Sequence, residues 1–295
     1  MKRILKYILT GTAVLSLMSC ERDLLNEEHY RKIIYLKSGD NNIYSYPHAM
    51  NNSISRGYIT VGSAGSMPLE KDMHVTFELW DTVRKEYNYR NFGDDSALYA
   101  KLLSSDRYII PSYTVTLKAG NPSSTAFFPI DVDANGLSPD STYMIPFRIT
   151  SEDCEINPNK DFVLYKIDLQ NRYSSSDFRY YKMKGLLIEV TADSVRSNIT
   201  GTKELFPLAA NRLRMFPASV VSSTDMKEIN DKTMEIIINA DSTVRIKPYK
   251  NAIIEQTEDK SFYNTGLKAF ELKYRYKDSD TGNWKLVEET LTRIE

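Results

Sequence analysis

Side chains that could break a glycosidic bond are scattered along this chain. A retaining or inverting glycosidase needs two carboxylates that face each other across a cleft. Glu78, Asp81, Glu189 and Glu271 lie in or beside expected strands, and their spacing does not pair them. Because the chain has 39 Asp and Glu, such candidates also arise by chance. We therefore expect no enzyme, and a hydrolase with an unrecognised carboxylate pair stays open as the weakest alternative.

Signals for metals and cofactors are also weak. His29, His48 and His74 are the three histidines, and their spacing is not that of a zinc site. The run 131–136 resembles the start of a calcium loop, but its twelfth position is Thr142 instead of the closing glutamate. A strand-connecting turn is the better interpretation. We expect no metal and no cofactor.

The N-terminus has the pattern of a secretion signal. Lys2 and Arg3 precede the mostly apolar run Ile4–Met18, and the small residue Ser19 follows it. The apolar run is too short for a mature membrane-spanning helix. Cys20 comes directly after the small residue. A cysteine at this place changes the interpretation of the cleavage site.

The run Leu17-Met18-Ser19-Cys20 resembles the bacterial lipobox. This resemblance implies a signal peptide at 1–19, a cysteine acylated with palmitate, and a tether at 20–30 to the membrane surface. Glu21 and Asp23 resemble the acidic export signal of Bacteroidetes lipoproteins, which implies the outer membrane and its external face. The alternative is an ordinary signal peptide with a chance cysteine.

Cys154 is the other cysteine of the chain. With Cys20 lipidated, no internal disulfide can form. Asp153 and Glu155 flank the thiol, and such acidic surroundings do not activate a cysteine. We expect a thiol without chemistry in a loop or at a strand end.

The body of the protein is large and nearly neutral. From Cys20 onward it has 276 of the 295 residues, enough for two domains with separate cores. Three of the 38 Lys and Arg precede Cys20, which leaves 35 basic against 39 acidic residues and a net charge of −4. Nucleic acid is therefore not expected as a partner, because neutralising phosphates needs clustered Lys and Arg.

Alternating apolar residues predict short strands in the first half. In Met73–Trp80, Val75, Phe77 and Leu79 share one face and polar residues occupy the other. Similar runs bring the number of expected strands to seven, at 31–36, 57–62, 113–117, 126–132, 142–149 and 162–169. We expect an immunoglobulin-like β-sandwich over residues 31–170.

Two segments of this half are expected outside the strands. Residues 44–48, which include Tyr44, Tyr46 and His48, read as part of a polar loop. Residues 97–103 read as a short helix behind an N-cap at Asp95.

A more specific signal lies between two of these strands. Leu137-Ser138-Pro139-Asp140 is followed by Tyr143, which opens the next strand. This arrangement is similar to the tyrosine corner of immunoglobulin-type sandwiches, in which the phenol hydrogen-bonds back to the turn. We expect a structural role for Tyr143.

Three pieces of the first half carry a family resemblance: 97–99 with Ile110-Pro111-Ser112-Tyr113, Leu117–Ser124, and 137–140 with 143–146. Together they resemble an uncharacterised N-terminal domain of Bacteroidetes surface lipoproteins, over roughly Ile33 to Asn171. Such proteins are often encoded beside SusC/SusD-type glycan importers, or the domain is fused to glycoside hydrolases. The resemblance implies an accessory sandwich and brings no catalytic residues.

The second half reads as consecutive hairpins. Three serines in 170–177 indicate a short linker. Beyond it, turn residues at 239–242 and 277–283 separate apolar strands. No obvious helix interrupts this series, so we expect an antiparallel barrel over 178–295. It is similar to the lipocalin-like C-terminal domain of the same lipoproteins.

Aromatic residues are the best candidates for ligand contact. The chain has 20 tyrosines, and carbohydrate sites use flat rings that stack on sugar C–H faces. Two clusters combine such rings with polar neighbours: Trp80, Tyr87 and Tyr89, and Tyr274, Tyr276 and Trp284. The alternative for any one ring is packing in a sheet. Residues 86–94 lack clean alternation and read as an exposed loop.

These patterns favour an all-β outer-membrane lipoprotein that binds a polysaccharide or oligosaccharide at the cell surface without cleaving it. Its partners would be the glycan, the membrane through the lipid anchor, and a SusC/SusD-type uptake complex. The main alternative is a fimbrillin-like structural or adhesive protein. Strand-like sequence begins near Arg31, which disfavours the long removable segment of that class.

Overall fold

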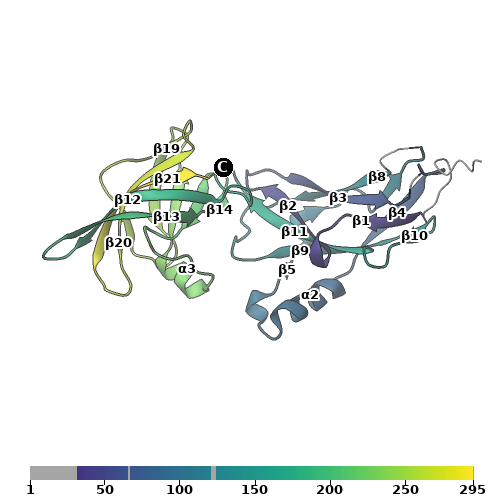
Figure 1. The fold of residues 1–295 in the computed structure, drawn as a ribbon, viewed down its shortest axis with the longest axis horizontal. Helices are drawn as coiled ribbons and strands as arrows, with labels where there is room; N and C mark the ends of the chain where they lie inside the picture. The colour runs from purple at the N-terminus through teal and green to yellow at the C-terminus, as the bar shows by residue number, and fades with distance from the viewer. Residues whose placement is uncertain (1–31, 66, 121–123, 295) are drawn as a thin grey trace, which may run out of the picture.

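A computed structural model of the protein describes residues 32–65, 67–120 and 124–294. Two all-β domains lie end to end along its long axis (Figure 1). The predicted signal peptide, Cys20 and the tether lie outside the described residues. None of the helices in the described ranges combines the length and the apolar character of a membrane span.

The N-terminal domain is a sandwich of two sheets. The five-stranded sheet has the order β10 (Glu155–Ile156), β1 (Ile33–Leu36), β3 (Ser55–Ser63), β8 (Thr125–Val132) and β6 (Tyr108–Ile109). The six-stranded sheet has the order β2 (Ile43–Ala49), β11 (Phe162–Gln170), β9 (Tyr143–Thr150), β4 (Met73–Leu79) and β7 (Thr114–Leu117), and β5 (Lys101–Leu102) also pairs with β9. The predicted sandwich is thus confirmed.

Aromatic rings fill the centre of the sandwich. Phe77 stacks on Phe128 with ring centroids 3.8 Å apart, and Phe147 meets Phe128 edge-on at 5.2 Å. These rings come from both sheets, so they join the two layers through apolar contact. The alternation predicted for β4 holds at Val75 and Phe77, which are buried, whereas Leu79 at the strand end is 49% exposed.

The turn before β9 forms the predicted tyrosine corner. The backbone N–H of Ser138 donates a hydrogen bond to the phenol oxygen of Tyr143 at 3.3 Å. Because the phenol reaches back to its own turn, it holds the turn against the start of the strand.

Three local predictions in this domain are wrong. Residues 43–49 form β2, which pairs in parallel with β11, although a polar loop was expected. The helix lies at α2 (Thr82–Phe92), where a loop was expected, and the short 3-10 turn η2 (Ser96–Leu98) and β5 replace the expected helix. Two other 3-10 turns are η1 (Asp40–Asn42) and η3 (Ser105–Arg107).

A buried side chain explains why α2 forms outside the predicted segment. Only Val83 and Asn88 of α2 are buried, so its sequence has little apolar periodicity. The Asn88 amide donates to the Ala100 carbonyl at 2.9 Å and accepts from the Ala100 N–H at 2.8 Å. This pair of bonds holds the chain at Ala100 extended, directly before β5 pairs with β9.

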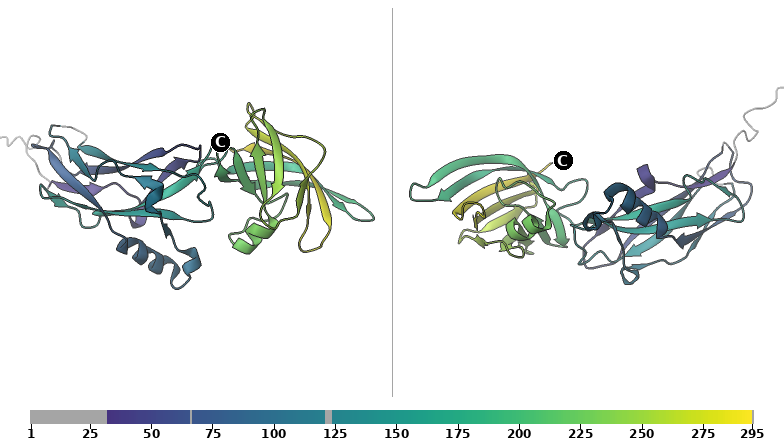
Figure 2. Two further views of the ribbon diagram at one scale, coloured as in Figure 1. Left: turned by 180° about the vertical axis from the view of Figure 1, so that it is seen from behind. Right: turned by 90° about the horizontal axis from the view of Figure 1, so that it is seen from below.

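The C-terminal domain is one curled ten-stranded sheet (Figure 2). Its main order is β13 (Val195–Glu204), β12 (Tyr180–Val190), β21 (Trp284–Arg293), β20 (Ala269–Lys277), β19 (Ser261–Asn264), β17 (Thr243–Pro248), β16 (Met234–Ile238), β15 (Arg212–Met215) and β14 (Phe206–Ala209), with β18 (Ile254–Gln256) against β20. Only Leu205 separates β13 from β14, so one bent run of chain forms both ends of this order.

The predicted hairpins β16–β17 and β20–β21 are confirmed. The expectation that no helix interrupts the hairpins was wrong, because α3 (Met226–Lys232) lies between β15 and β16. Asp225 caps α3 by accepting hydrogen bonds from the N–H groups of Lys227 and Glu228.

The serine run between the domains is folded and buried. Ser174 and Ser175 are 1% and 2% exposed. Asn171 donates to the carbonyl of Ala209 at 2.7 Å and accepts from the N–H of Ser174 at 2.9 Å. The short connection predicted at 170–177 is therefore a hydrogen-bonded joint.

A buried ion pair crosses this joint. Arg214 of β15 donates two hydrogen bonds to the carboxylate of Asp140, which lies in the tyrosine-corner turn. Their side chains are 2% and 7% exposed. The guanidinium also lies over the rings of Phe206 and Tyr249, at 5.0 and 5.4 Å from the ring centroids. Each domain thus supplies half of a charge pair that is removed from water.

We predict that Asp140→Asn lowers the free energy of unfolding by about 3 kcal/mol, because it leaves the Arg214 charge buried without its partner. Glu255→Gln is the matched control, since Glu255 pairs with Arg275 and both side chains are 50% exposed. The control should cost less than about 1 kcal/mol. Urea unfolding measures both values, and equal small losses would contradict the structural role of the buried pair.

Candidate functional site

The first predicted aromatic cluster is divided between two environments. Trp80 is half-buried, and the Arg148 guanidinium lies 4.7 Å from its ring centroid. Tyr87 packs with Trp80 in a small apolar cluster under α2, whereas Tyr89 is 68% exposed. The structure therefore does not bring these three rings together on one surface, and Tyr89 alone offers most of its ring to solvent.

The rings of the second predicted cluster lie on opposite faces of the sheet, because side chains alternate along a strand. Tyr274 and Tyr276 are 0% and 6% exposed and belong to the barrel core. Trp284 starts β21 opposite Lys277 and is half-buried, with the Arg275 guanidinium 4.6 Å from its ring centroid. Successive residues of a strand point to opposite faces, so Lys277 and Trp284 share the outer face.

Tyr274 needs a correction as a predicted ligand contact. Its ring has no exposed surface, and its hydroxyl already bonds inside the barrel. The period of two from Phe270 to Tyr276 was itself the signal for an inward-facing row. For Trp80, Tyr87, Tyr89 and Trp284, contact with a ligand stays a prediction.

Tyr276 lines a pocket at one mouth of the barrel. The pocket lies between α3, the turn of the β20–β21 hairpin and two loop segments; its lining residues are Pro217, Val220, Asp231, Lys232, Ala252, Ile253, Ile254, and 276–280. Its inner volume is about 50 Å³. Since one water needs roughly 10–15 Å³ by this measure, the pocket can take the edge of a ring with its hydroxyls but cannot enclose the ring.

Carboxylates surround this barrel-mouth pocket. Asp280 is 81% exposed and lies 3.8 Å from the ammonium of Lys232. Asp231 accepts a hydrogen bond from the amide of Asn251 at 3.0 Å, which contributes most to lowering its pKa. Burial by itself raises the pKa of Asp278, but hydrogen bonds from Lys285 and from backbone N–H groups outweigh it and lower the pKa. The carboxylates of Asp231 and Asp278 are thus ionised near neutral pH and can accept hydrogen bonds.

The sequence did not single out these acids as binding residues. Asp278 and Asp280 lie in the predicted hairpin turn, and Asp231 lies on the unpredicted helix α3. An Asp-Ser-Asp turn is ordinarily a solvated turn, so its composition carries no functional signal. Only the packing of α3 beside the hairpin brings the three carboxylates to one pocket.

A buried polar cluster holds one wall of the pocket. Lys203 donates hydrogen bonds to the carbonyls of Pro217 and Val220, both at 3.3 Å. Tyr274 accepts from the N–H of Ala218 at 2.8 Å and donates to Oε1 of Glu289 at 2.7 Å. The segment 217–220 is therefore tied to charged side chains inside the barrel.

Burial shifts the pKa of both charged groups in this cluster. It raises the pKa of Glu289 to about 7 and lowers the pKa of Lys203 to about 8. Oε2 of Glu289 has no hydrogen-bond partner among the described residues. Near neutral pH the folded protein therefore holds a carboxyl group close to its titration point.

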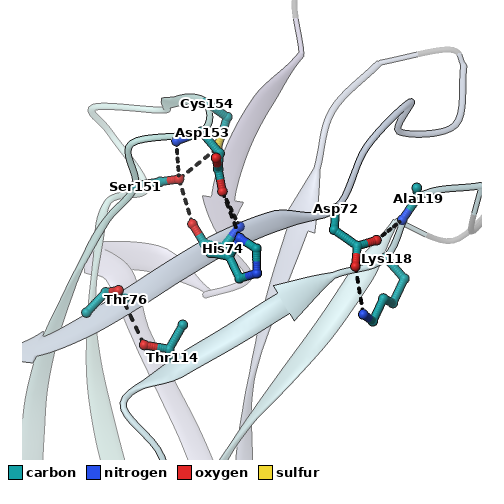
Figure 3. A network of polar contacts seen from close by, with 9 residues as sticks. All are labelled: Asp72, His74, Thr76, Thr114, Lys118, Ala119, Ser151, Asp153 and Cys154. Atoms are coloured by element: carbon teal, nitrogen blue, oxygen red, sulfur yellow. Dashed lines mark hydrogen bonds and ion pairs between the residues drawn. The ribbon is translucent and has the colours of Figure 1, made fainter.

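A Ser, His and Asp also meet in the sandwich, but without catalytic geometry (Figure 3). The hydroxyl of Ser151 donates to the backbone carbonyl of His74 at 2.6 Å instead of to its ring. Asp153 accepts from the N–H of His74 at 2.8 Å and lies 3.0 Å from its Nδ1. Cys154 is a half-buried free thiol whose Sγ donates to Ser151 Oγ at 3.3 Å. The group fastens the loop after β9 to β4.

The structure divides the four carboxylates that the sequence offered for hydrolysis between the two domains. Glu78 bonds Arg148 and Asp81 bonds Arg84 within the sandwich. Glu189 and Glu271 lie on β12 and β20 of the other domain. The two acids of the sandwich are thus each engaged by an arginine.

Hollows beside the domain joint are a weaker candidate for a site. Pro139 contributes to two of them, on either side of the Asp140–Arg214 pair. Phe206 lines one and Tyr249 lines the other. Arg214 already lies over both rings, so this aromatic surface serves the joint.

The structure thus defines an all-β protein with a sandwich and a curled antiparallel barrel. Residues 30–156 match a family model described as an N-terminal domain, and residues 161–292 match one described as a C-terminal domain. The second match includes β11, which in the structure pairs with β2 and β9 of the sandwich. No curated protein sequence matches the chain.

Solved structures with the same two-domain fold come from Bacteroides. A Bacteroides ovatus protein of unknown function has a TM-score of 0.66 at 15% identity, covering 88% of this chain and 94% of its own. A B. ovatus multidomain protein including DUF1735 has 0.62 at 14%, with the same coverage. An auxiliary nutrient binding protein from Bacteroides thetaiotaomicron has 0.63 at 12%, covering 86% and 92%. At this identity the likeness concerns the fold.

We predict that Glu289→Gln stabilises the protein only at higher pH. In the folded state the carboxyl group of Glu289 keeps its proton up to about pH 7, whereas its ordinary pKa is 4.5. The wild-type protein therefore loses stability as the pH rises from about 4.5 to about 7. The gain from the variant should be near zero at pH 4 and about 3 kcal/mol at pH 7.5.

Urea unfolding at both pH values measures this gain. Glu288→Gln is the matched control, because Glu288 is the exposed neighbour on the same strand and should show no such difference. A gain that is the same at both pH values would contradict the raised pKa of Glu289.

Proposed function

We propose that this protein is a lipid-anchored protein of the outer membrane, facing the cell exterior, that binds a glycan without cleaving it and serves a SusC/SusD-type uptake system. The observation that carries the proposal is the barrel-mouth pocket, in which Tyr276 and apolar residues meet the carboxylates of Asp231, Asp278 and Asp280. The lipid anchor at Cys20 rests on the lipobox resemblance.

The chemistry of the pocket suits a sugar. Sugars present C–H faces that pack on apolar and aromatic surface and hydroxyls that donate to carboxylates, and such sites combine an apolar lining with a few placed polar groups. Here Pro217, Val220 and Ile254 supply apolar surface beside the acidic rim. The pocket is too small to enclose a ring, so it would hold one edge of a sugar residue.

Comparison with other proteins supports a binding role. A Bacteroides protein with the same two-domain fold is described as an auxiliary nutrient binding protein. In the described ranges, the Ser151, His74 and Asp153 group lacks the hydroxyl-to-ring contact of a hydrolase. Both observations favour retention of a nutrient over its cleavage.

The chain from residue 21 onward, run through affinity gels cast with different polysaccharides, tests the proposal. We expect retardation by at least one glycan, with no new reducing ends. The double variant Asp231→Ala/Asp280→Ala should weaken binding at least tenfold, because each lost bond from a hydroxyl to a charged group is worth about 1.5–3 kcal/mol.

Asp259→Ala is the control, since Asp259 is an exposed acid on another part of the barrel that pairs with Lys273. It should bind like the wild type. No retardation across a broad panel would overturn the proposal in favour of a structural or adhesive role. New reducing ends would point to a hydrolase instead.

A further inference from the structure

A band of four aromatic rings on the sandwich lies outside both predicted clusters. It runs from Tyr44 and Tyr46 on β2 to Tyr58 on β3 and Phe127 on β8. Successive ring centroids are 6.3, 6.5 and 6.1 Å apart. Each ring therefore touches the next, and we call this set the aromatic band.

The strand topology brings these rings together. The chain changes sheets between β1 and β2. On β3, β1 covers only the last residues, from Val61 to Ser63. The start of β3 is thus left beside β2, which carries Tyr44 and Tyr46 (Figure 1). The sequence could not show this, because residues 43–49 read as a loop.

Gly57 permits the close approach of the band to β3. A Cβ at this position would lie 2.8 Å from the ring of Tyr46 and would collide with the hydroxyl of Tyr165. Tyr165 stacks under Tyr46 at 6.1 Å, and its hydroxyl lies 2.7 Å from Nε2 of the buried His48. A buried layer therefore supports the half-buried ring of Tyr46, the middle of the band.

The outer part of the band is open to solvent. Tyr58 is 37% exposed and Phe127 is 60% exposed, and they meet edge to face on the outer side of the five-stranded sheet. A phenylalanine this exposed in the middle of a strand contributes little to the core, because its side chain stays in water.

A salt bridge lies next to the band. Arg56 donates two hydrogen bonds to the carboxylate of Asp131, at 2.6 and 2.7 Å. No other Lys, Arg, Asp or Glu of β3 or β8 lies within the described parts of these two strands. Lys37, directly after β1, is exposed, and its backbone N–H donates to the carbonyl of Thr60, so one cation lies at this side of the face. An acidic polysaccharide carries repeated charges and needs several cations, so the face fits an uncharged ligand better.

We propose that the aromatic band is a second glycan-binding site and that it takes an extended, uncharged polysaccharide. The rings of Tyr58 and Phe127 stack on the C–H faces of the sugars, and the tyrosine hydroxyls bond to sugar hydroxyls. The centroid spacing is comparable with the length of one sugar residue, so a chain lies across several rings. This inference rests on the proposed function but not on the barrel-mouth pocket.

The double variant Tyr58→Ala/Phe127→Ala tests the band. Both rings are exposed, so the variant should keep the wild-type melting temperature. We expect its affinity for a neutral polysaccharide such as galactomannan, xylan or starch, whichever the wild type binds, to fall at least tenfold. Titration calorimetry measures this loss. Phe127→Trp should retain binding, because it keeps a flat ring at the site.

Phe262→Ala is the matched control, since its ring is 41% exposed but lies on β19 of the barrel, outside both predicted clusters. It should bind like the wild type. If Tyr58→Ala/Phe127→Ala keeps the wild-type affinity while Asp231→Ala/Asp280→Ala loses affinity, the band is not a binding site. The proposed function would then still stand. A wild type that binds no glycan would overturn both.

Two further outcomes concern the kind of ligand. Preference for an acidic polysaccharide such as polygalacturonate over the neutral ones would overturn the assignment of an uncharged ligand. A wild-type dimer that the double variant converts to monomer in sedimentation would also overturn the proposal, because the band would then bind a second copy of this chain. A monomeric wild type supports it.

Discussion

The buried pair of Asp140 and Arg214 is the interaction on which the arrangement of this molecule depends. Removing two charges from water is costly, and only close, well-oriented contact between the two groups repays the cost. Here the carboxylate belongs to the tyrosine-corner turn and the guanidinium lies over two rings of the barrel. The folded serine run beside it adds hydrogen bonds across the same joint. The domains therefore form one continuous body.

Several of the abundant tyrosines serve this architecture. Tyr143 fastens a turn, Tyr165 supports one edge of the sandwich, and Tyr274 connects the barrel core to the segment at its mouth. A buried tyrosine needs a partner for its hydroxyl, and each of these has one. The rings that remain open to a ligand are fewer, and they lie where a strand faces solvent or meets a loop.

The candidate sites combine residues that are distant in sequence. The barrel-mouth pocket needs α3 beside the β20–β21 turn, and the aromatic band needs β2 beside β3 after the chain has changed sheets. In both places a packed layer lies beneath the site: the cluster of Lys203, Tyr274 and Glu289 in the barrel, and Tyr165 with His48 in the sandwich. Rigid support of this kind lowers the cost of ordering a binding surface.

The sequence by itself determined the all-β class, most strands of the sandwich, the tyrosine corner and the two hairpins of the barrel, because period-two alternation and turn residues are local signals. It could not place α2, whose buried Asn88 side chain bonds the backbone of Ala100, or β2, whose partner β11 lies more than a hundred residues away. Only the tertiary structure decided which rings are exposed. An aromatic side chain favours a strand equally on either face, and long-range packing selects the face that meets water.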